Sequence, residues 1–237
     1  MPKPRSYHKL RYFEIRQGLT FLRKNELATF SSILITKRRC LMTKVLVLYY
    51  SKNGRTKKLA TKIAAGIEQA GASAVLRTVP SITTKTNINN EPSVPNEGDI
   101  YVSKRDLVEC DGLALGSPTH FGNMAAPLKH FIDSLTDVWL KGTLVGKPAC
   151  VFTASSSMHG GQETTLISMM LPLFHHGMCI VGLPYSEPEL HATASGCSPY
   201  GVSSVQIGSS DELSNDEAIL SVKMGIRLAQ HAIKLAT

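Results

Sequence analysis

Five short apolar runs recur along the chain from residue 42 onward and predict β-strands. They are continuous rather than alternating, which is typical of parallel strands that are buried on both faces. The runs are Val45–Tyr50, Ala74–Val79, Gly112–Leu115, Ala149–Phe152 and Met178–Leu183.

Apolar residues between and after these runs recur every three to four positions and predict amphipathic helices. The four predicted buried faces are Leu59, Ile63, Ile67 and Ala70, then Leu128, Phe131, Ile132 and Leu135, then Leu166, Met169, Met170 and Leu173, and last Ile219, Val222, Ile226, Ala229 and Ile233. Strands that alternate with helices indicate an α/β fold, a doubly wound five-stranded parallel sheet with helices on both faces. Ligands bind such sheets outside the carboxyl ends of the strands.

Two segments lack this periodicity. Residues 80–99 read as an inserted surface loop. The stretch from Pro184 to about Ser210 is rich in Pro, Gly and Ser, and structureless loops of this length are uncommon in compact domains. We therefore expect the second segment to be functional or mobile.

The positive charge of the chain is confined to one end. Residues 1–41 carry four Lys and six Arg against Glu14 and Glu26, which accounts for the whole formal net charge of +8 and leaves residues 42–237 neutral. A neutral body gives no electrostatic case for nucleic-acid binding. We interpret residues 1–41 as a poorly ordered basic extension, in preference to a transit peptide or a membrane-surface helix, and residues 42–237 as one domain. Deletion of residues 1–41 is expected to leave ligand binding and activity intact.

The five cysteines favour a reducing compartment. Their number is odd, they are widely spaced without a Cys-x-x-Cys pair, and the chain shows neither a secretory signal nor a membrane span. The sequence thus predicts reduced thiols in a cytoplasmic protein. Cys150 and Cys179 stand inside apolar runs and are expected to pack in the core.

A phosphate-binding turn is predicted where the first apolar run ends. Val47–Thr56 runs from a strand through a turn into a helix, and N–H groups at the start of a helix favour an anion. Ser51 and Thr56 add hydroxyls, and Gly54 permits close approach of the backbone. The spacing excludes a Walker loop and a three-glycine dinucleotide fingerprint. The alternative is an ordinary turn with Thr56 as helix N-cap.

Two further loops follow predicted strands. Gly116–Met124 offers backbone N–H donors and the aromatic ring of Phe121, which suit the edge and face of a flat cofactor ring. Ser155–Glu163 is rich in Ser and Gly and opens a helix, so it can donate several N–H groups. Taken alone, the first loop could be an ordinary Pro-Gly connection and the second a flexible linker.

Together these motifs resemble the flavodoxin family, and within it the WrbA-type NAD(P)H:quinone oxidoreductases. Val47–Thr56 matches the family's FMN-phosphate signature at each fixed position. Further similarity lies in Pro118–Met124, Gly160–Glu163, His175–Met178 and Ser198–Gly201. The resemblance covers residues 42–237 nearly end to end.

The resemblance implies one non-covalently bound FMN per subunit and a homotetramer whose active sites lie near subunit contacts. It implies a flavin phosphate held by Ser51, Lys52, Asn53, Gly54, Arg55 and Thr56, and flavin contacts from Thr119, His120, Phe121, Ala154, Ser155, Ser156, Ser157, Met158, His159, Gly160 and His176. Trp139 matches a substrate-facing aromatic of the family, although sequence alone favours a core or interface tryptophan there. Asn53 is also assigned to the substrate side. Asn53 and His120 replace a tyrosine and an arginine that are common in relatives, in the region of the nicotinamide contacts.

The activity implied by the resemblance is two-electron reduction of quinones by NADH or NADPH, with ping-pong hydride transfer through FMN. His176 is the candidate catalytic residue, as a hydrogen-bond donor to the reduced flavin or to the quinone oxygen. The pair His175-His176 lacks a third ligand at a suitable spacing, so no metal is expected. The competing readings are a flavodoxin-type single-electron carrier and a transcription regulator. No basic groove or helix-turn-helix pattern in residues 42–237 supports the second of these.

Overall fold

The computed structural model describes residues 42–82, 98–206 and 212–236. The described residues from Thr43 to Ala236 belong to one compact unit, which contains all the elements below. The expectations for residues 1–41, and those for most of the segment 80–99, lie outside the described residues.

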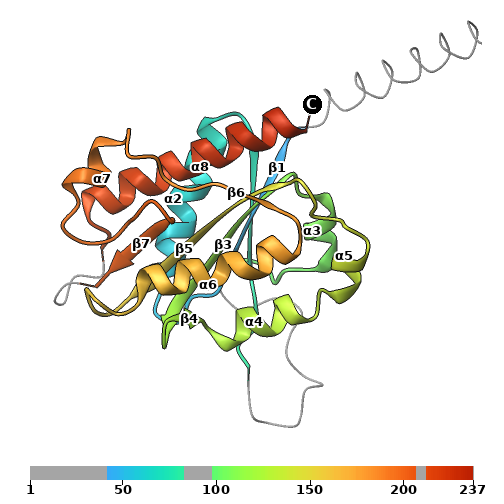
Figure 1. Cartoon of the computed structure of the whole chain (residues 1–237), viewed down its shortest axis with the longest axis horizontal. Helices are drawn as coiled ribbons and strands as arrows, with labels where there is room; N and C mark the ends of the chain where they lie inside the picture. Colours follow the sequence, from blue (N-terminus) through green and yellow to red (C-terminus); the bar gives the residue numbers. More distant parts are fainter. Residues whose placement is uncertain (1–41, 83–97, 207–211, 237) are drawn as a thin grey trace, which may run out of the picture. The chain divides into compact units, whose positions relative to one another are not determined.

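Five parallel strands form the main path of the sheet, in the order β2-β1-β3-β5-β6, and Figure 1 shows β1, β3 and β5 next to one another. The five strands are β1 (Lys44–Tyr49), β2 (Ser73–Thr78), β3 (Gly112–His120), β5 (Pro148–Ser155) and β6 (Cys179–Ile180). The order doubles back, because β2 lies on one side of β1 while the later strands lie on the other. This confirms the predicted doubly wound sheet, and the carboxyl ends of β1, β3 and β5 share one edge.

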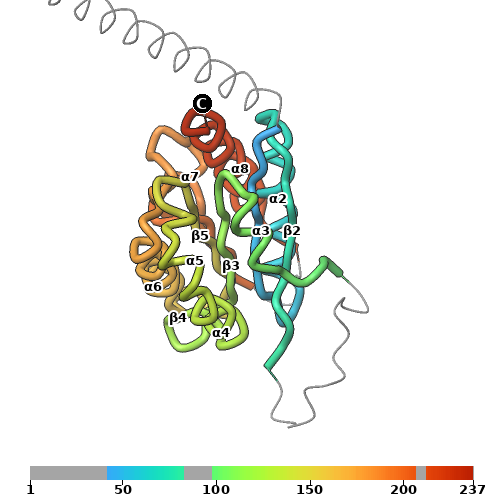
Figure 2. Tube along the Cα trace, turned by 90° about the vertical axis from the view of Figure 1, so that its right-hand side faces the viewer, coloured from blue at the N-terminus to red at the C-terminus, as the bar shows by residue number. Residues whose placement is uncertain are grey.

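Helices cover both faces of this sheet, and in Figure 2 α5 and α6 lie to the left of β3 while α2 lies to its right. One face carries α2 (Arg55–Gln69) and α8 (Asn215–Leu235), and the other carries α3 (Lys104–Glu109), α4 (Ala126–Asp133), α5 (Thr136–Leu140) and α6 (Gln162–His175). Each face has its own apolar core. Alternate residues of β1 serve the two cores, Val45 and Val47 on the α2 side and Leu46 and Leu48 on the α6 side, as the period of a strand requires.

The fifth strand differs from its prediction. The apolar run Met178–Leu183 contributes only β6, which pairs with the first two residues of β5, whereas β7 (Val202–Val205) pairs with the last four. The chain between them leaves the sheet, forms α7 (Pro188–Ala192) and returns. The sequence did not reveal β7 because Val-Ser-Ser-Val has no apolar run, although all four residues are buried. The segment predicted to be functional or mobile thus supplies a strand of the sheet.

The buried face of α8 also differs from its prediction. Of the five predicted positions only Ala229 is buried, and the others lie at the half-buried flank of a stripe that contains Leu220, Met224, Gly225 and Leu228. The cause is the close crossing of α2 and α8. A Cβ atom at Gly66 would lie 2.0 Å from the carbonyl oxygen of Val222, so only glycine permits this separation of the two backbones. Small residues therefore occupy the centre of the contact.

The predicted location of two cysteines is tested as well. Cys150 is buried in the core, and burial raises the pKa of its thiol to about 12. Cys179, also expected in the core, is exposed because β6 is only two residues long and its side chain points outward. That expectation was wrong. Cys110, Cys150, Cys179 and Cys197 are all free thiols.

Candidate functional site

Three connections meet at the carboxyl edge of the sheet, one after each of β1, β3 and β5 (Figure 1). They are the turn Tyr50–Gly54, a hairpin around Phe121 and the loop Ser156–Gly161. The central position of β1, β3 and β5 places all three side by side. This is the edge at which doubly wound sheets bind their ligands.

The turn after β1 is suited to an anion. Gly54 has a φ of 84°, provides no side-chain cap, and α2 begins directly after it without an acidic residue in its first turn. The Ser51 hydroxyl points at this helix start, where it accepts a hydrogen bond from the Lys57 N–H at 3.4 Å. Hydroxyl and backbone donors thus converge at the positive end of the α2 dipole, as a phosphate requires. Lys52 and Asn53 are exposed at the tip of the turn.

Two residues of the predicted phosphate grip have their side chains turned inward. Thr56 is buried, and so is Arg55, whose Nη1 donates to Ser204 Oγ at 2.8 Å on β7. Arg55 can therefore bind an anion through its backbone N–H, at the first position of α2, rather than through its side chain. The signature gave no indication of this, because the partner of Arg55 lies 149 residues further along the chain.

The connection after β3 is a hairpin rather than an irregular loop. Thr119 and His120, at the end of β3, pair antiparallel with β4 (Asn123–Met124). The two turn residues Phe121 and Gly122 have φ angles of 53° and 75°, the pattern of a type I′ turn. Phe121 stands at the tip with its side chain fully exposed, at 109%. An exposed aromatic ring in the left-handed region is unusual, and it presents a free face at the site.

The loop after β5 is held by a residue to which the sequence assigned no role. Gln162 is buried, and its Nε2 donates to the carbonyl oxygens of Ser157 at 2.8 Å and Met158 at 2.9 Å. Ser155 Oγ adds a third bond to the Ser157 carbonyl at 2.8 Å. These bonds fix the backbone while the side chains of Ser156, Ser157, Met158 and His159 stay exposed. Gln162 was visible only as a member of the Gly-Gly-Gln-Glu motif.

The hairpin and this loop are in direct contact. A Cβ atom at Gly161 would lie 3.2 Å from Gly122 Cα, and Gly161 itself has a φ of 92°. Behind them, Thr119 Oγ1 and Thr153 Oγ1 are 3.1 Å apart, which joins the ends of β3 and β5. Ala154 is buried at the end of β5, and Gly160 closes the loop through its N–H to the Ser157 carbonyl at 3.2 Å. The predicted residues of these two loops therefore form one surface.

His176 and Trp139 lie elsewhere. His176 follows the last residue of α6, whereas the Ser156–Gly161 loop precedes its first, and a helix of 14 residues separates them by about 20 Å. Trp139, half exposed on α5, donates its indole N–H to the His175 carbonyl at 2.8 Å. Both residues thus stand at the amino edge of the sheet. Within one chain they are not brought to the three loops.

His176 has the character of a neutral hydrogen-bonding group. It is buried, and burial together with the neighbouring His175 lowers the pKa of its imidazole below the usual value. In the part of the chain that the structure describes, its Nδ1 has no hydrogen-bond partner. No group of three His, Cys, Asp or Glu side chains among residues 42–82, 98–206 and 212–236 could hold a metal.

A doubly wound sheet with a hydroxyl-lined helix start, an exposed aromatic at a hairpin tip and a pinned Ser/Gly loop at one edge defines a flavodoxin-like protein. The model of the NADPH-dependent FMN reductase family matches residues 43–187, so the chain belongs to this family. This confirms the class of protein that the motifs indicated.

Full-length relatives agree with this assignment. "NAD(P)H dehydrogenase (quinone)" of Chromohalobacter salexigens is 38% identical over 204 residues, covering 82% of this chain and 100% of the relative. The protein of the same name from Gluconacetobacter diazotrophicus is 37% identical over 199 residues, with 82% and 100% covered.

Solved structures share the fold. A flavodoxin, WrbA-like protein from Agrobacterium tumefaciens superposes with a TM-score of 0.60 at 22% identity, over 81% of this chain and 99% of its own. Oxidised Flavodoxin 2 from Bacillus cereus gives 0.53 at 16% identity, over 79% and 99%. No described helix is long and apolar enough to cross a membrane.

Proposed function

We propose that this protein is an NAD(P)H:quinone oxidoreductase that uses FMN. The proposal depends on one structural observation above all, the meeting of an anion-binding turn, an exposed aromatic and a pinned Ser/Gly loop at one sheet edge. It is supported by relatives named NAD(P)H dehydrogenase (quinone), whose whole length this chain matches. NADH and NADPH are both candidate reductants.

The residues at the carboxyl edge fit FMN. Ser51 and the N–H groups of the turn and first helical turn, Lys52 to Thr56, would hold the phosphate, and nothing acidic in the first turn of α2 would repel it. Phe121, with Thr119 and His120 beside it, and the loop Ala154–Gly160 would hold the ring system, one FMN per chain without a covalent bond. Bound there, FMN would accept a hydride from the nicotinamide and pass two electrons to the quinone, the two substrates using the same pocket in turn.

A second copy of the chain would complete the site. In one chain His176 and Trp139 stand about 20 Å from the flavin loops, at the far end of α6. They can serve the reaction only at the flavin site of another subunit. We therefore propose a homo-oligomer, a homotetramer as in the WrbA-type proteins, in which His176 and Trp139 of one subunit face the FMN of another. Asn53, exposed in the turn, would lie on the nicotinamide side.

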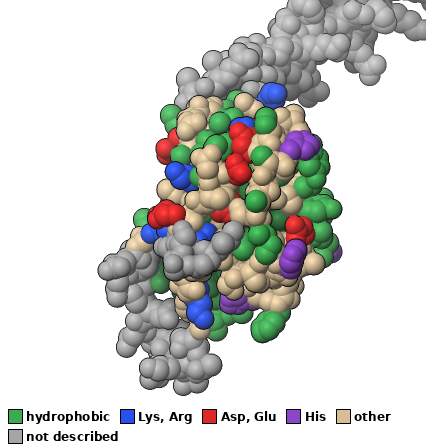
Figure 3. Space-filling model, turned by 90° about the vertical axis from the view of Figure 1, so that its left-hand side faces the viewer, with side chains coloured by type: hydrophobic (Ala, Val, Ile, Leu, Met, Phe, Trp, Pro, Cys, Tyr) green, Lys and Arg blue, Asp and Glu red, His purple; other side chains and the backbone are tan. Residues whose placement is uncertain are grey.

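The surface around the end of α6 supports this assembly. Exposed apolar side chains follow the outer face of α6 at helical spacing, and more stand on α5 and the turn after it. They are Ile167, Leu171, Phe174, Trp139, Leu140 and Val145. Hydrophobic side chains also gather along the right-hand margin of the space-filling view, the side on which α6 lies (Figure 3). Contiguous apolar surface of this kind is typical of an interface.

His176 is suited to bind rather than to transfer charge. Because its lowered pKa keeps the imidazole neutral at pH 7, the ring can donate one hydrogen bond. We propose that it donates to the quinone oxygen and thereby orients the quinone. Trp139 offers the flat apolar face against which a quinone ring packs.

The test is a steady-state assay of FMN-loaded protein with NADH or NADPH and benzoquinone. We expect rapid oxidation of the nicotinamide with one quinone reduced for each nucleotide consumed. Retention of single electrons without oxidation of the nicotinamide would instead establish an electron carrier. Ser51→Ala/Thr56→Ala should weaken FMN binding by about 1.5–3 kcal/mol, the contribution of a hydrogen bond from the Ser51 hydroxyl to a charged group.

We also propose that residues 42–237 suffice for this activity and that the protein acts in the cytoplasm. The relatives are matched over their whole length by 82% of this chain. The thiols at Cys110, Cys150, Cys179 and Cys197 are free, as in a reducing compartment. A protein without residues 1–41 should bind FMN and turn over quinone like the full chain.

A further inference from the structure

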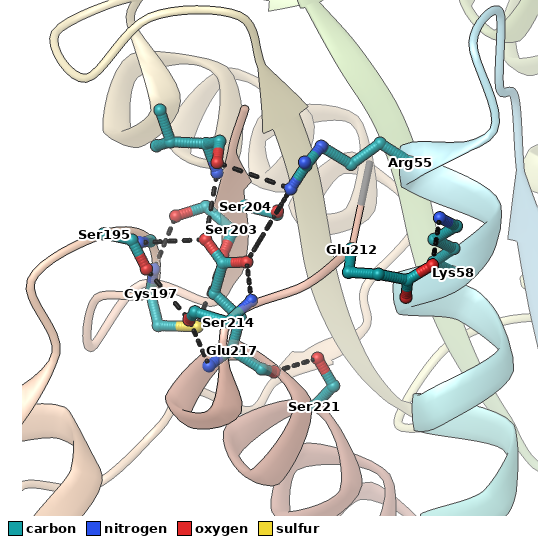
Figure 4. Close-up of polar contacts among 12 residues, drawn as sticks. Arg55, Lys58, Ser195, Cys197, Ser203, Ser204, Glu212, Ser214, Glu217 and Ser221 are labelled. Carbon is teal, nitrogen blue, oxygen red and sulfur yellow. Dashed lines mark hydrogen bonds and ion pairs between the residues drawn. The ribbon is translucent and has the colours of Figure 1, made fainter. Parts of the chain in front are cut away.

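A buried ion pair lies directly behind the turn that would hold the phosphate. Arg55, the first residue of α2, and Glu217, near the start of α8, have side chains that are 7% and 1% exposed, and Nη1 is 4.0 Å from Oε2. Ser204 on β7 joins them, because its Oγ accepts from Arg55 Nη1 at 2.8 Å and donates to Glu217 Oε2 at 2.8 Å (Figure 4). The close-up shows the three side chains converging from α2, β7 and α8.

The carboxylate of Glu217 is fully supplied with donors. Its Oε1 accepts the N–H groups of Val205 at 3.0 Å and Gly196 at 3.2 Å, and its Oε2 accepts the N–H of Ser214 at 3.0 Å. Buried charges are stable only with such complete pairing. Glu217 therefore ties the start of α8, the strand β7 and the chain before it to a single point, and Arg55 joins α2 to the same point.

Stability alone does not account for this arrangement. Burying two charges costs about as much as their attraction returns, and apolar residues of the same volume often serve a fold as well. The position of the pair suggests a different role. Of the elements that the pair joins, α2 begins at the phosphate turn with N–H groups that would face the anion, and β7 pairs with the last residues of β5.

We propose that Glu217 is a positioning residue for the FMN phosphate. By holding the Arg55 guanidinium inward, it fixes the direction of the first turn of α2 and neutralises the arginine, so that the Ser51 hydroxyl and backbone N–H groups bind the phosphate. This inference rests on the proposed binding of FMN. It makes the affinity for FMN depend on Gly196, Ser204, Val205, Ser214 and Glu217, which lie beyond the region 43–187 that the family model matches.

The experiment compares FMN with riboflavin, which has the same ring system but no phosphate. Apoprotein is titrated with each flavin by fluorescence quenching, for the wild type and for Glu217→Gln. We expect the Kd for FMN to rise at least tenfold and the Kd for riboflavin to change less than twofold. Glu212→Gln is the matched control. Glu212 also pairs with a basic residue of α2, Lys58, at 3.1 Å, but its side chain is 83% exposed. This variant should leave the Kd values for FMN and riboflavin unchanged.

Two further variants keep the inference testable if Glu217→Gln folds poorly. Ser204→Ala keeps both charges but removes the bridging hydroxyl, and should weaken FMN at least threefold with riboflavin unaffected. Arg55→Met/Glu217→Gln leaves no unpaired charge, and should recover part of the FMN affinity lost in Glu217→Gln.

Equal losses for FMN and riboflavin, or no loss for FMN, would overturn the positioning role. Failure of the double variant to recover any affinity would overturn the part assigned to Arg55. The proposed function fails separately, if the wild-type protein neither binds FMN nor reduces quinone.

Discussion

Phe121 combines full exposure with a φ of 53°, a conformation that costs a residue with a Cβ atom about 1 kcal/mol. Asn-Gly is the preferred sequence for such a turn. Phe121→Asn should therefore raise the stability of the apoprotein by about 1 kcal/mol, or roughly 2–4 °C in melting temperature. It should at the same time weaken FMN binding by about 0.5–1.5 kcal/mol, the worth of an aromatic contact. Thermal melts and flavin titrations measure the two effects.

Phe121→Ala separates the two contributions. Alanine removes the ring but retains the cost of the left-handed conformation, so FMN binding should weaken without a gain in stability. If Phe121→Asn is no more stable than Phe121→Ala, the backbone at this tip is not strained.

His176 makes the stability of the protein depend on pH in a defined direction. Burial lowers the pKa of its imidazole below the ordinary value of about 6.5. As the pH falls below 6.5, the imidazole therefore binds a proton in the unfolded chain before it does so in the folded protein. This contribution to stability is fully present above pH 6.5 and is lost as the pH falls. The melting temperature of the wild type should therefore decline between pH 7.5 and 5.5, and that of His176→Gln should decline less. His130→Gln changes an exposed histidine, and its melting temperature should depend on pH as that of the wild type does. If the melting temperature of His176→Gln fell with pH as steeply as that of the wild type, His176 would not be the source of the dependence.

The limits of the sequence are clearest for single side chains. Ser51, Gly54 and Phe121 stand at the site because spacing within a strand-turn-helix or a hairpin determines their place. Arg55 belongs to the same motif, yet its side chain points inward, since Ser204 and Glu217 come from distant parts of the chain. Local spacing carries no information about such partners. The role of Gln162 was missed for a related reason. Its side chain donates to backbone carbonyl oxygens, which every residue has, so its partners leave no pattern in the sequence.

At the scale of elements, strands that form continuous apolar runs were predicted well and the others were not. β1, β3 and β5 lie in the middle of the sheet, buried on both faces, and each produces an unmistakable run. The split fifth strand is shorter, and half of β7 is serine. The buried stripe of α8 was missed because glycine and alanine, rather than its isoleucines, occupy the closest contact.

The crossing of α2 and α8 should be intolerant of a single methyl group. In Gly225→Ala the new Cβ would lie 2.0 Å from the Ile63 carbonyl oxygen, and in Gly66→Ala equally close to that of Val222. Overpacking costs about 1–3 kcal/mol or more at a backbone contact, against a gain of about 1 kcal/mol in helix propensity. Both variants should lose stability in urea unfolding. Gln69→Ala, at an exposed position of α2, is the control, and unchanged stability of the glycine variants would refute the close crossing.

At the scale of the whole molecule, the two groups of site residues stand at opposite ends of α6. If another subunit supplies His176, two defective chains can complement each other. His176→Ala keeps the flavin loops, and Ser51→Ala/Thr56→Ala keeps His176. Co-expressed and purified together, they should show more quinone turnover than the mean of the two variants alone. Activity at or below that mean would show that each chain works by itself, and size-exclusion chromatography verifies that mixed oligomers formed.

The packing of α2 against α8 also governs when the chain can fold. The apolar face of α2 is covered by α8, and Arg55 bonds to a residue 149 positions later. On the ribosome, α2 can pack against β1 and β2 early, but the side that α8 covers stays open until α8 has been synthesised. Contacts of such long range form slowly, and an uncovered apolar helix is a target for chaperones and for aggregation. Nascent chains of this protein should therefore stay protease-sensitive until α8 has left the exit tunnel.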